Sequence, residues 1–379
     1  MRRAGLLLSL VLGCVSIDLR AAADEAVAGA GDRLAAAPEP LRTHDGPEPP
    51  RYRWTLVTDA AAFSPRDGAG ALVYDDAMWL LGGWNPADKA TNPNVAGTNN
   101  EVWRSVDGAL WQKIKPNTHL DDSFDPASDW EARHTAGYVV HQGKMWIVGG
   151  DANLGHYQSD VWNSTDGKTW TRVAATVPWA PRILHSAVAH AGKIWVFGGQ
   201  AVTKRLQRHV GHFKGPTDER FYNDVWNSAD GVTWTRVTEH APWAARGQIG
   251  GAAVKDGRIW VIGGGTYYTD CRADVWSSAD GVDWVCHTRQ APWTPRQYHD
   301  VAVFDGRLWI LEGMVQDDDR RFRNRKDVWH SADGTQWTEL PDTPWKERHA
   351  ASVFVFRDAL WMVAGNNMQR DVWRLDRVR

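Results

Sequence analysis

Residues 224–234 read DVWNSADGVTW, and variants of this stretch recur along the chain, at residues 101–111, 160–170, 274–284 and 327–337, with a shortened copy at 371–373. In each full copy, two short β-prone segments, each containing a Trp, flank a Ser-x-Asp-Gly sequence. Asp-Gly between such segments is a strong hairpin signal, because Gly adopts a positive φ without a clash from a Cβ atom. The repeated unit is therefore predicted to be a tight antiparallel hairpin.

A second repeated element precedes each hairpin, and residues 182–199, RILHSAVAHAGKIWVFGG, are an example. It begins with Arg, passes through small and β-branched residues, turns at Gly or Asp, and ends in an apolar strand that contains a Trp. The element and its hairpin make four strands in about 50 residues, which is the period of a propeller blade, and no helical period competes with it. Six copies begin at an Arg: Arg66, Arg133, Arg182, Arg246, Arg296 and Arg348.

The two ends of the repeat region complement each other. The sixth copy stops after its third strand, at residues 371–375, whereas residues 53–57 (RWTLV) precede the first copy and match the fourth-strand pattern at 169–173 (TWTRV). We therefore predict an all-β fold over residues 51–379, a six-bladed β-propeller of four-stranded blades whose last blade is closed by the N-terminal strand. Closure of the ring leaves only short sheet edges exposed.

The N-terminal region has the pattern of an export signal. Residues 1–23 contain a basic start, an apolar run and three consecutive alanines at 21–23, and the apolar run is too short to span a membrane as a helix. Residues 24–50 are rich in Ala and Pro and are predicted to be a disordered tether. We expect an exported protein of the bacterial periplasm or the extracellular space, with lipoprotein anchoring through Cys14 as the alternative.

Composition and charge narrow the possible fold and the possible partners. The chain of 379 residues suits one large β domain, and a net charge of −3 gives no nucleic-acid footprint. Cys271 and Cys286 would remain after cleavage of the signal, and an oxidising compartment permits a disulfide between them. The expected pairing of Trp276 with Trp284 does not place these cysteines opposite each other, so the bridge is left open.

The Gly198-Gly199 pair and its equivalents, the fourth-strand Trp170 and the Pro181-Arg182 opening resemble the kelch-repeat propellers, the superfamily that includes the galactose oxidase central domain. The resemblance covers residues 52–379 and implies the fold, which hosts both enzymes and binding modules. The hairpin turn also resembles the Asp-box of sialidase-type propellers, although here Gly directly follows Asp. Asp readily bonds its own turn backbone. Five aspartates are therefore predicted to be turn formers: Asp107, Asp166, Asp230, Asp280 and Asp333.

The most variable connections lie between blades and between second and third strands, on one face of the predicted propeller, and a binding site is expected there. The six leading Arg residues would surround the channel mouth on this face. Guanidinium groups bind carboxylate, sulfate or phosphate bidentately, so the ring is a candidate ligand site. In the alternative interpretation, each Arg ties its linker by bonding carbonyl groups, as a residue repeated in every blade often does.

Departures from the repeat are further candidates. Glu312 replaces the first Gly of the Gly-Gly pair in the fifth blade. We expect it to act as a catalytic base or ligand-orienting group, or alternatively to form a salt bridge with a local Arg. Tyr157, Tyr267 and Tyr298 are candidate ligand contacts, because Tyr rings stack on sugars, or else pack their own loops. The repeated His positions, which include His185 and His299, are expected to pack between blades. No metal or other cofactor is expected.

The favoured function is an exported binding propeller for an anionic or carbohydrate small ligand, or for an acidic segment of a protein partner, acting as a monomer. One alternative is a metal-independent kelch-type enzyme such as a sialic acid mutarotase or epimerase, in which Glu312 would act with Arg296 or Arg348. A second alternative is a protein–protein interaction scaffold. Copper chemistry of the galactose oxidase type is not expected, because no repeat position offers its Tyr, His and Cys set.

Overall fold

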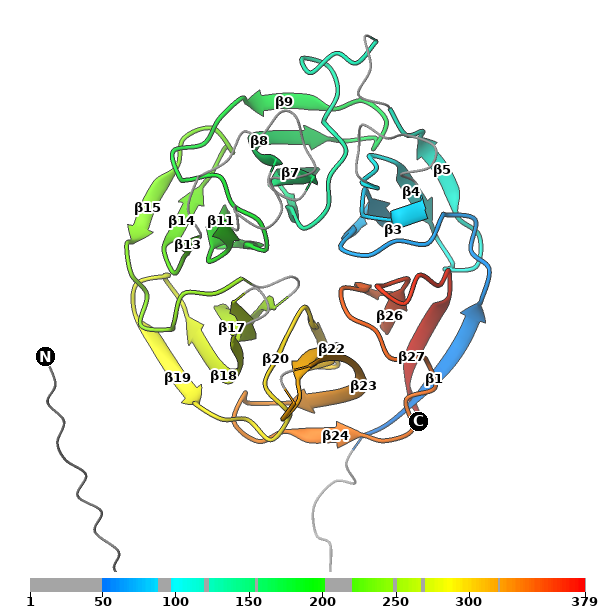
Figure 1. The fold of residues 1–379 in the computed structure, drawn as a ribbon, viewed down its shortest axis with the longest axis vertical. Helices are drawn as coiled ribbons and strands as arrows, with labels where there is room; N and C mark the ends of the chain where they lie inside the picture. Colours follow the sequence, from blue (N-terminus) through cyan, green and yellow to red (C-terminus); the bar gives the residue numbers. More distant parts are fainter. Residues whose placement is uncertain are drawn as a thin grey trace, which may run out of the picture. The chain divides into compact units, whose positions relative to one another are not determined.

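The computed structural model describes residues 50–87, 97–118, 123–153, 156–201, 220–247, 251–266, 270–319 and 321–378. Their small antiparallel sheets are arranged around a central axis as a β-propeller, so the all-β prediction is confirmed (Figure 1). The predicted signal peptide, Cys14, Tyr267 and all of the predicted tether except Pro50 lie outside the described residues. In the part of the chain that is described, no helix is long and apolar enough to cross a membrane.

Four of the sheets have four antiparallel strands each. The first contains β2 (Gly70–Tyr74), β3 (Ala77–Leu81), β4 (Val102–Ser105) and β5 (Gln112–Lys115). The second contains β6 (Gly137–His141), β7 (Lys144–Asn153), β8 (His156–Ser164) and β9 (Thr171–Ala174). The third contains β10 (Ser186–His190), β11 (Lys193–Phe197), β14 (Val225–Ser228) and β15 (Thr235–Thr238). The fourth contains β25 (Ser352–Phe356), β26 (Ala359–Val363), β27 (Val372–Val378) and β1 (Arg51–Thr58).

The other strands form a two-stranded and a nine-stranded sheet. The former is β12 (Gln200–Ala201) with β13 (Arg220–Phe221). The latter contains β16 (Ala252–Lys255), β17 (Arg258–Thr266), β18 (Asp270–Ser278), β19 (Trp284–Thr288), β20 (Arg296–Gln297), β21 (Asp300–Phe304), β22 (Arg307–Gln316), β23 (Phe322–Ser331) and β24 (Thr338–Leu340). Two antiparallel runs, β16 to β19 and β21 to β24, are joined because Arg296 of β20 pairs with Arg272 of β18 and Val315 of β22.

The N-terminal strand β1 pairs antiparallel with the C-terminal strand β27. Arg51 lies opposite Val378, Trp54 opposite Leu375 and Leu56 opposite Trp373. The two ends of the described chain thus meet at the rim of the propeller, where β1 is drawn in blue beside β27 in red (Figure 1). Tyr52 and Trp54 pack against a core of apolar side chains between β21–β24 and the sheet of β1.

The hairpin turns have the predicted chemistry. In one turn, the Ser164 hydroxyl accepts a hydrogen bond from the amide of Gly167 at 2.8 Å, and Asp166 Oδ1 accepts from the amides of Lys168 and Thr169 at 2.9 and 2.7 Å. The same pattern occurs at Asp107, Asp230, Asp280 and Asp333. The prediction that these aspartates form turns is therefore confirmed.

The register of the hairpins differs from the prediction. Trp276 lies opposite Cys286, and Trp284 lies opposite Ser278, so the expected pairing of Trp276 with Trp284 is wrong. The physical reason is that the turn is closed by Ser278, whose hydroxyl bonds the Gly281 amide, and this leaves Trp284 as the first residue of the returning strand. Cys271 and Cys286 are both free thiols, and no disulfide joins them.

A belt of backbone hydrogen bonds links neighbouring sheets around the axis. The belt residues each lie two positions after a leading Arg, and all have φ between 52° and 58°. The amide of Ala350 donates to the carbonyl of Tyr298 at 2.8 Å, Gly68 to Ala350 and Thr135 to Gly68 at 3.0 Å, and Leu184 to Thr135 at 3.3 Å. Positive φ turns these peptide groups along the circumference, so that the four described links join neighbouring sheets from Tyr298 through Ala350, Gly68 and Thr135 to Leu184.

Candidate functional site

The six leading Arg residues are buried and share one set of contacts. Arg296 is the example: Nε donates to the carbonyl of Thr294 at 3.1 Å, and Nη1 donates to the carbonyl of Glu312 at 2.7 Å. Its two terminal nitrogens also donate to the two carboxylate oxygens of Asp327, at 3.0 and 2.6 Å. The ion pairs of the series are Arg66–Glu101, Arg133–Asp160, Arg182–Asp224, Arg246–Asp274, Arg296–Asp327 and Arg348–Asp371.

These contacts neutralise the guanidinium groups within their own sheets. Burial alone would raise the pKa of the Asp327 carboxyl, but hydrogen bonds from Arg296 and its charge hold the pKa below the usual range. Trp329 Nε1 adds a third donor to Asp327 at 2.7 Å. The geometry matches the alternative interpretation, in which each Arg ties its own linker and strands, and an anionic ligand would have to compete with a carboxylate already in place. Ligand binding by the ring stays a prediction.

The two described Tyr candidates lie in one hydrophobic cluster. Tyr157 and Tyr298 are 4% and 7% exposed, and they share the cluster with Ile183, Leu184 and Met314. Tyr298 also lies 5.4 Å from the ring of His349, measured between centroids. The cluster therefore brings together residues from several sheets, but it leaves little of either Tyr ring open for stacking on a sugar.

Glu312 occupies a position that is unusual for its residue type. Its φ is 50° and its side chain is fully buried. Oε1 accepts a hydrogen bond from the Ala351 amide at 3.1 Å. Among the described residues Glu312 forms no ion pair with an Arg, because Arg296 and Arg348 are bonded to Asp327 and Asp371. The expected alternative of a salt bridge is therefore wrong.

Comparison with the equivalent glycines explains how a Glu fits there. Next to Gly263, the buried His299 of the following repeat fills the space, and a Cβ on Gly263 would lie 2.9 Å from its ring. His299 Nε2 is bonded to the Ile262 carbonyl at 2.9 Å, and His185 bonds Val148 in the same way, which confirms that these His residues pack between sheets. Beside Glu312 the following repeat has Ala351, so the Glu side chain takes the volume of the missing imidazole.

Asp300 and Glu312 form a pair of buried carboxyl groups, here called the carboxyl pair. They lie on the neighbouring strands β21 and β22 and are 6% and 0% exposed, and within the described residues Asp300 Oδ2 and Glu312 Oε2 are buried without a hydrogen-bond partner. Burial and then the neighbouring Glu312 raise the pKa of Asp300 well above its usual value. Burial raises the pKa of Glu312 to about 7. Two neighbouring buried carboxyl groups without a bonded cation resist ionising together, so burial and repulsion both favour their protonated forms.

Asp300, one member of the carboxyl pair, lines a cavity on the propeller axis. The cavity has a volume of about 190 Å³ and is lined by residues of β2, β6, β10, β16, β21 and β25. Asp300 lines it at the fourth position after a leading Arg, where Gly70, Gly137, Ser186 and Ser352 stand in other copies. Sequence reasoning did not assign Asp300 to the site, although an acid among Gly and Ser at one repeat position was a readable signal.

Polar side chains extend from this region across neighbouring sheets. Burial raises the pKa of Asp67 to about 7, and its Oδ2 accepts a hydrogen bond from Asn366 Nδ2 at 3.4 Å. Asn366 Oδ1 accepts from Asn324 Nδ2 at 3.1 Å, and Asn324 Oδ1 bonds His349 Nδ1 at 2.7 Å. Burial lowers the pKa of His349 to about 4, so its ring is neutral at pH 7. A neutral His donates from Nδ1 here, which orients the whole chain of amides.

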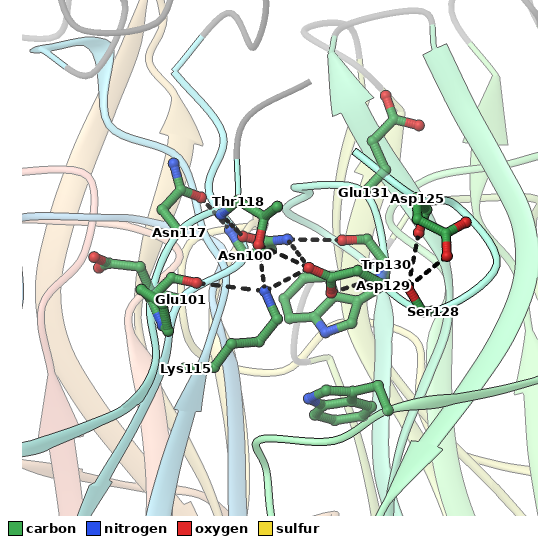
Figure 2. Close-up of polar contacts among 12 residues, drawn as sticks. Asn100, Glu101, Lys115, Asn117, Thr118, Asp125, Ser128, Asp129, Trp130 and Glu131 are labelled. Carbon is green, nitrogen blue, oxygen red and sulfur yellow. Dashed lines mark hydrogen bonds and ion pairs between the residues drawn. The ribbon is translucent and has the colours of Figure 1, made fainter. Parts of the chain in front are cut away.

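A second polar cluster surrounds Lys115 and is structural (Figure 2). Lys115 Nζ lies 2.9 Å from Asp129 Oδ2 and 3.0 Å from Thr118 Oγ1, while Asn100 Nδ2 donates to the carbonyl of Trp130 at 2.8 Å. Burial lowers the pKa of the Lys115 ammonium group. Asp129 stands where other linkers have the Pro of a Pro-Trp pair, so the cluster anchors the longer linker that precedes Arg133.

No group of three or more His, Cys, Asp or Glu side chains within the described ranges is placed to hold a metal ion. Neither a known protein family nor a curated protein matches the chain. The geometry around the carboxyl pair is therefore what any functional assignment has to be built on.

Proposed function

We propose that this protein is an exported kelch-type propeller that binds one small polyhydroxyl ligand, a carbohydrate, in the axial cavity beside the carboxyl pair. The observation that carries the proposal is the placement of Asp300, a buried carboxyl on the cavity wall at a position where other copies have Gly or Ser. Carboxyl groups hydrogen-bond sugar hydroxyls as acceptors when ionised and as donors when protonated. A cavity of about 190 Å³ suits a ligand of monosaccharide size.

The proposal includes six blades, with the last closed by β1. The four separate four-stranded sheets and the two antiparallel runs of the nine-stranded sheet support this count, because each of the six sets follows a leading Arg. The pairing of β1 with β27 supports the closure. The kelch resemblance of the Gly-Gly pairs fits the same architecture. The export signal over residues 1–23 stays part of the proposal on the sequence alone.

Of the two ligand classes expected from the sequence, the carbohydrate has more support than the anion. Each leading guanidinium already bonds a carboxylate, and Asp300, Glu312 and Asp67 add acidic groups near the axis. An anionic ligand in the cavity would face the carboxyl pair, which would repel it. A neutral polyhydroxyl ligand meets no such penalty and can exchange hydrogen bonds with Asp300.

A ligand screen tests this proposal. The chain without residues 1–23 would be titrated with a panel of neutral monosaccharides and oligosaccharides, with binding followed by ligand-observed NMR and calorimetry. We expect at least one neutral sugar to bind, and Asp300→Ser, which restores the residue found at Ser186 and Ser352, to weaken it about tenfold or more. If no sugar in the panel binds at millimolar concentration, or if Asp300→Ser leaves binding unchanged, the cavity is not the site.

The carboxyl pair also favours a second candidate, a metal-independent acid–base enzyme of the mutarotase or epimerase kind. Two neighbouring buried carboxyl groups with raised pKa, that of Glu312 to about 7, can supply both a general acid and a general base. The test is the rate at which the anomers of a bound sugar interconvert, measured by NMR exchange with and without protein. An acceleration that disappears in Asp300→Ser would support catalysis, and an unchanged rate with a bound sugar would leave a binding protein.

A further inference from the structure

The charges around the axis do not balance. Six cationic Arg side chains near the channel are matched one to one by the carboxylates of Glu101, Asp160, Asp224, Asp274, Asp327 and Asp371. Asp67, Asp300 and Glu312 remain as three further acidic groups, and they are 7%, 6% and 0% exposed. No ion pair of these three groups is formed with a Lys, Arg or His within the described ranges, so the region has an excess of acid.

The carboxyl pair is surrounded by three groups from neighbouring segments that affect its charge. In the linker before β25, the Ala351 amide donates a hydrogen bond to Glu312 Oε1. The positive charge of Arg348 acts to lower the pKa of Glu312, but the Arg348 guanidinium group is hydrogen-bonded to Asp371. Asp67, in the linker before β2, also faces Glu312. Burial raises the pKa of Asp67, and repulsion from the negative charge of Glu312 raises it further. Within the described residues, no cationic side chain forms an ion pair with either member of the carboxyl pair.

Uncompensated acid borders a cavity that also has unused hydroxyl groups. Thr135 and Tyr138 line the same cavity as Asp300. Within the described residues, neither the Thr135 hydroxyl, on a side chain buried to all but 6%, nor the Tyr138 hydroxyl has a hydrogen-bond partner. Buried polar groups are normally paired, so unpaired hydroxyls on the cavity wall indicate a ligand or water that would complete them.

We propose that the axial cavity selects a small ligand that carries an ammonium group, such as an amino sugar, and that this cation becomes the counterion of the carboxyl pair. This inference rests on the proposed function and specifies its ligand class. The ammonium group donates to the carboxylate of Asp300, while the hydroxyls of the ligand bond Thr135 and Tyr138. A proton that the carboxyl pair releases on binding goes to the buffer, so the pair gains one negative charge as the positively charged ammonium group binds.

The experiment uses a matched pair of probes, glucose and 6-amino-6-deoxyglucose, on the chain without residues 1–23. The two sugars have the same ring and differ in one hydroxyl and one charge. We expect the amino sugar to bind about tenfold more tightly than glucose at pH 8, because a hydrogen bond to a charged group is the stronger kind. The difference should shrink at pH 5.5, where the carboxyl pair keeps its proton. Calorimetry in buffers of different ionisation enthalpy should detect proton release on binding of the amino sugar.

Two variants and a control separate the carboxyl pair from general charge effects. Asp300→Ser should abolish the preference for the amino sugar. Glu312→Gly combined with Ala351→His, which rebuilds the arrangement of Gly263 and His299, should do the same in a differently packed chain. Asp283→Asn, an exposed change of equal charge on a hairpin turn, should keep the preference intact.

The outcomes distinguish the inference from the function it rests on. If glucose binds in an Asp300-dependent manner and the amino sugar binds no better at pH 8, the ammonium inference is overturned and the binding function remains. If neither glucose, the amino sugar nor any sugar of the panel binds, the proposed function itself is overturned. If calcium chloride raises the melting temperature in an Asp300-dependent manner and abolishes amino sugar binding, the cavity selects a metal cation, and the ligand class is wrong.

Discussion

Trp54 of the N-terminal strand packs edge to face against Trp345, with ring centroids 4.3 Å apart and planes at 88°. The same relationship joins a fourth-strand Trp to a linker Trp elsewhere: Trp234 lies 4.3 Å from Trp179 at 89°. Trp54, although more than 280 residues from Trp345 in sequence, therefore takes the role that each hairpin supplies locally in other repeats. The strand β1 thus contacts the rest of the propeller through a Trp side chain as well as through its backbone pairing with β27.

The first prediction concerns this seam. Trp54→Ala should lower the free energy of unfolding by about 3 kcal/mol, at the low end of the range for losing a packed Trp, because Trp54 is only half-buried. Arg53→Ala, an exposed change on the same strand, should have little effect and serves as the control. Urea unfolding monitored by Trp fluorescence measures both. Equal stability of the two variants would show that β1 does not hold the seam.

The second prediction separates backbone strain from packing at the hairpin turns. Gly167 has φ of 70°, and a Cβ there would lie 2.3 Å from Trp79, whereas Gly143 has φ of 68° and a Cβ there would have no atom within 4 Å. Gly143→Ala should therefore cost about 1–2 kcal/mol from strain alone. Gly167→Ala should cost roughly 2–4 kcal/mol, since overpacking is added. Thermal unfolding of both variants checks the difference, and equal losses would mean that the turn does not press on Trp79.

The third prediction concerns the turn carboxylates. Asp166→Ala should reduce stability by roughly 0.5–2 kcal/mol, because two backbone amides lose their acceptor. Burial alone would raise the pKa of Asp166, but the hydrogen bonds from these amides and from Ser164 together hold the pKa below its usual value. Its contribution is therefore present above the unfolded pKa and lost as the pH falls through the folded one. Urea unfolding at pH 7 and at pH 2 should show a gap between wild type and variant that closes in acid.

The fourth prediction concerns the Arg ties. Arg296→Met should destabilise the fold by about 3 kcal/mol, because Asp327 would be left in a mostly buried place without its cation. Arg323→Met is the matched control, since the Arg323 side chain is 58% exposed and pairs with Asp317 at the surface, where such a pair contributes at most about 1 kcal/mol. A stable Arg296→Met variant would contradict the tie and restore the ligand role expected for this residue.

The fifth prediction is a dependence of stability on pH. The pKa of Glu312 is raised from 4.5 to about 7 by burial, so the folded state holds its proton more tightly than the unfolded chain does. The resulting stabilisation is fully present below pH 4.5 and is lost as the pH rises through about 7. Asp300→Asn should make the loss of stability with rising pH less steep, because it removes one of the two neighbouring buried carboxyl groups. Unfolding curves at pH steps from 4.5 to 8.5 measure the slope, with Asp283→Asn as the control.

Much of the architecture was predictable because it is periodic. The Asp-Gly turns, the alternating apolar strands and the match between residues 53–57 and a fourth strand each depend on local chemistry that recurs, so repetition multiplies a weak signal. The hairpin register was not predictable in the same way. The register depends on the hydroxyl of Ser278, which closes the turn so that Trp284 lies opposite Ser278 and not opposite Trp276.

The candidate site was predictable only where it breaks the repeat. Glu312 was identified because Gly-Gly is expected there, and Asp300 departs from Gly or Ser at its repeat position in the same way, but that the two acids and Asp67 lie close together became visible only when the sheets were placed around the axis. The Arg ring shows the opposite case: the sequence places six guanidinium groups near a channel, yet it cannot show that each one faces a carboxylate of its own sheet, because that pairing spans between 23 and 42 residues.

The backbone belt separates the shape of the channel from its chemistry. Because the links between sheets run through peptide groups, Tyr298, Ala350, Gly68, Thr135 and Leu184 hold equivalent places with quite different side chains. Substitution at the belt or two positions further on, where Asp300 stands, leaves the connections between neighbouring repeats in place. Such a frame lets a lineage exchange the groups that face the axis one at a time, so new ligand preferences can arise without a redesign of the ring.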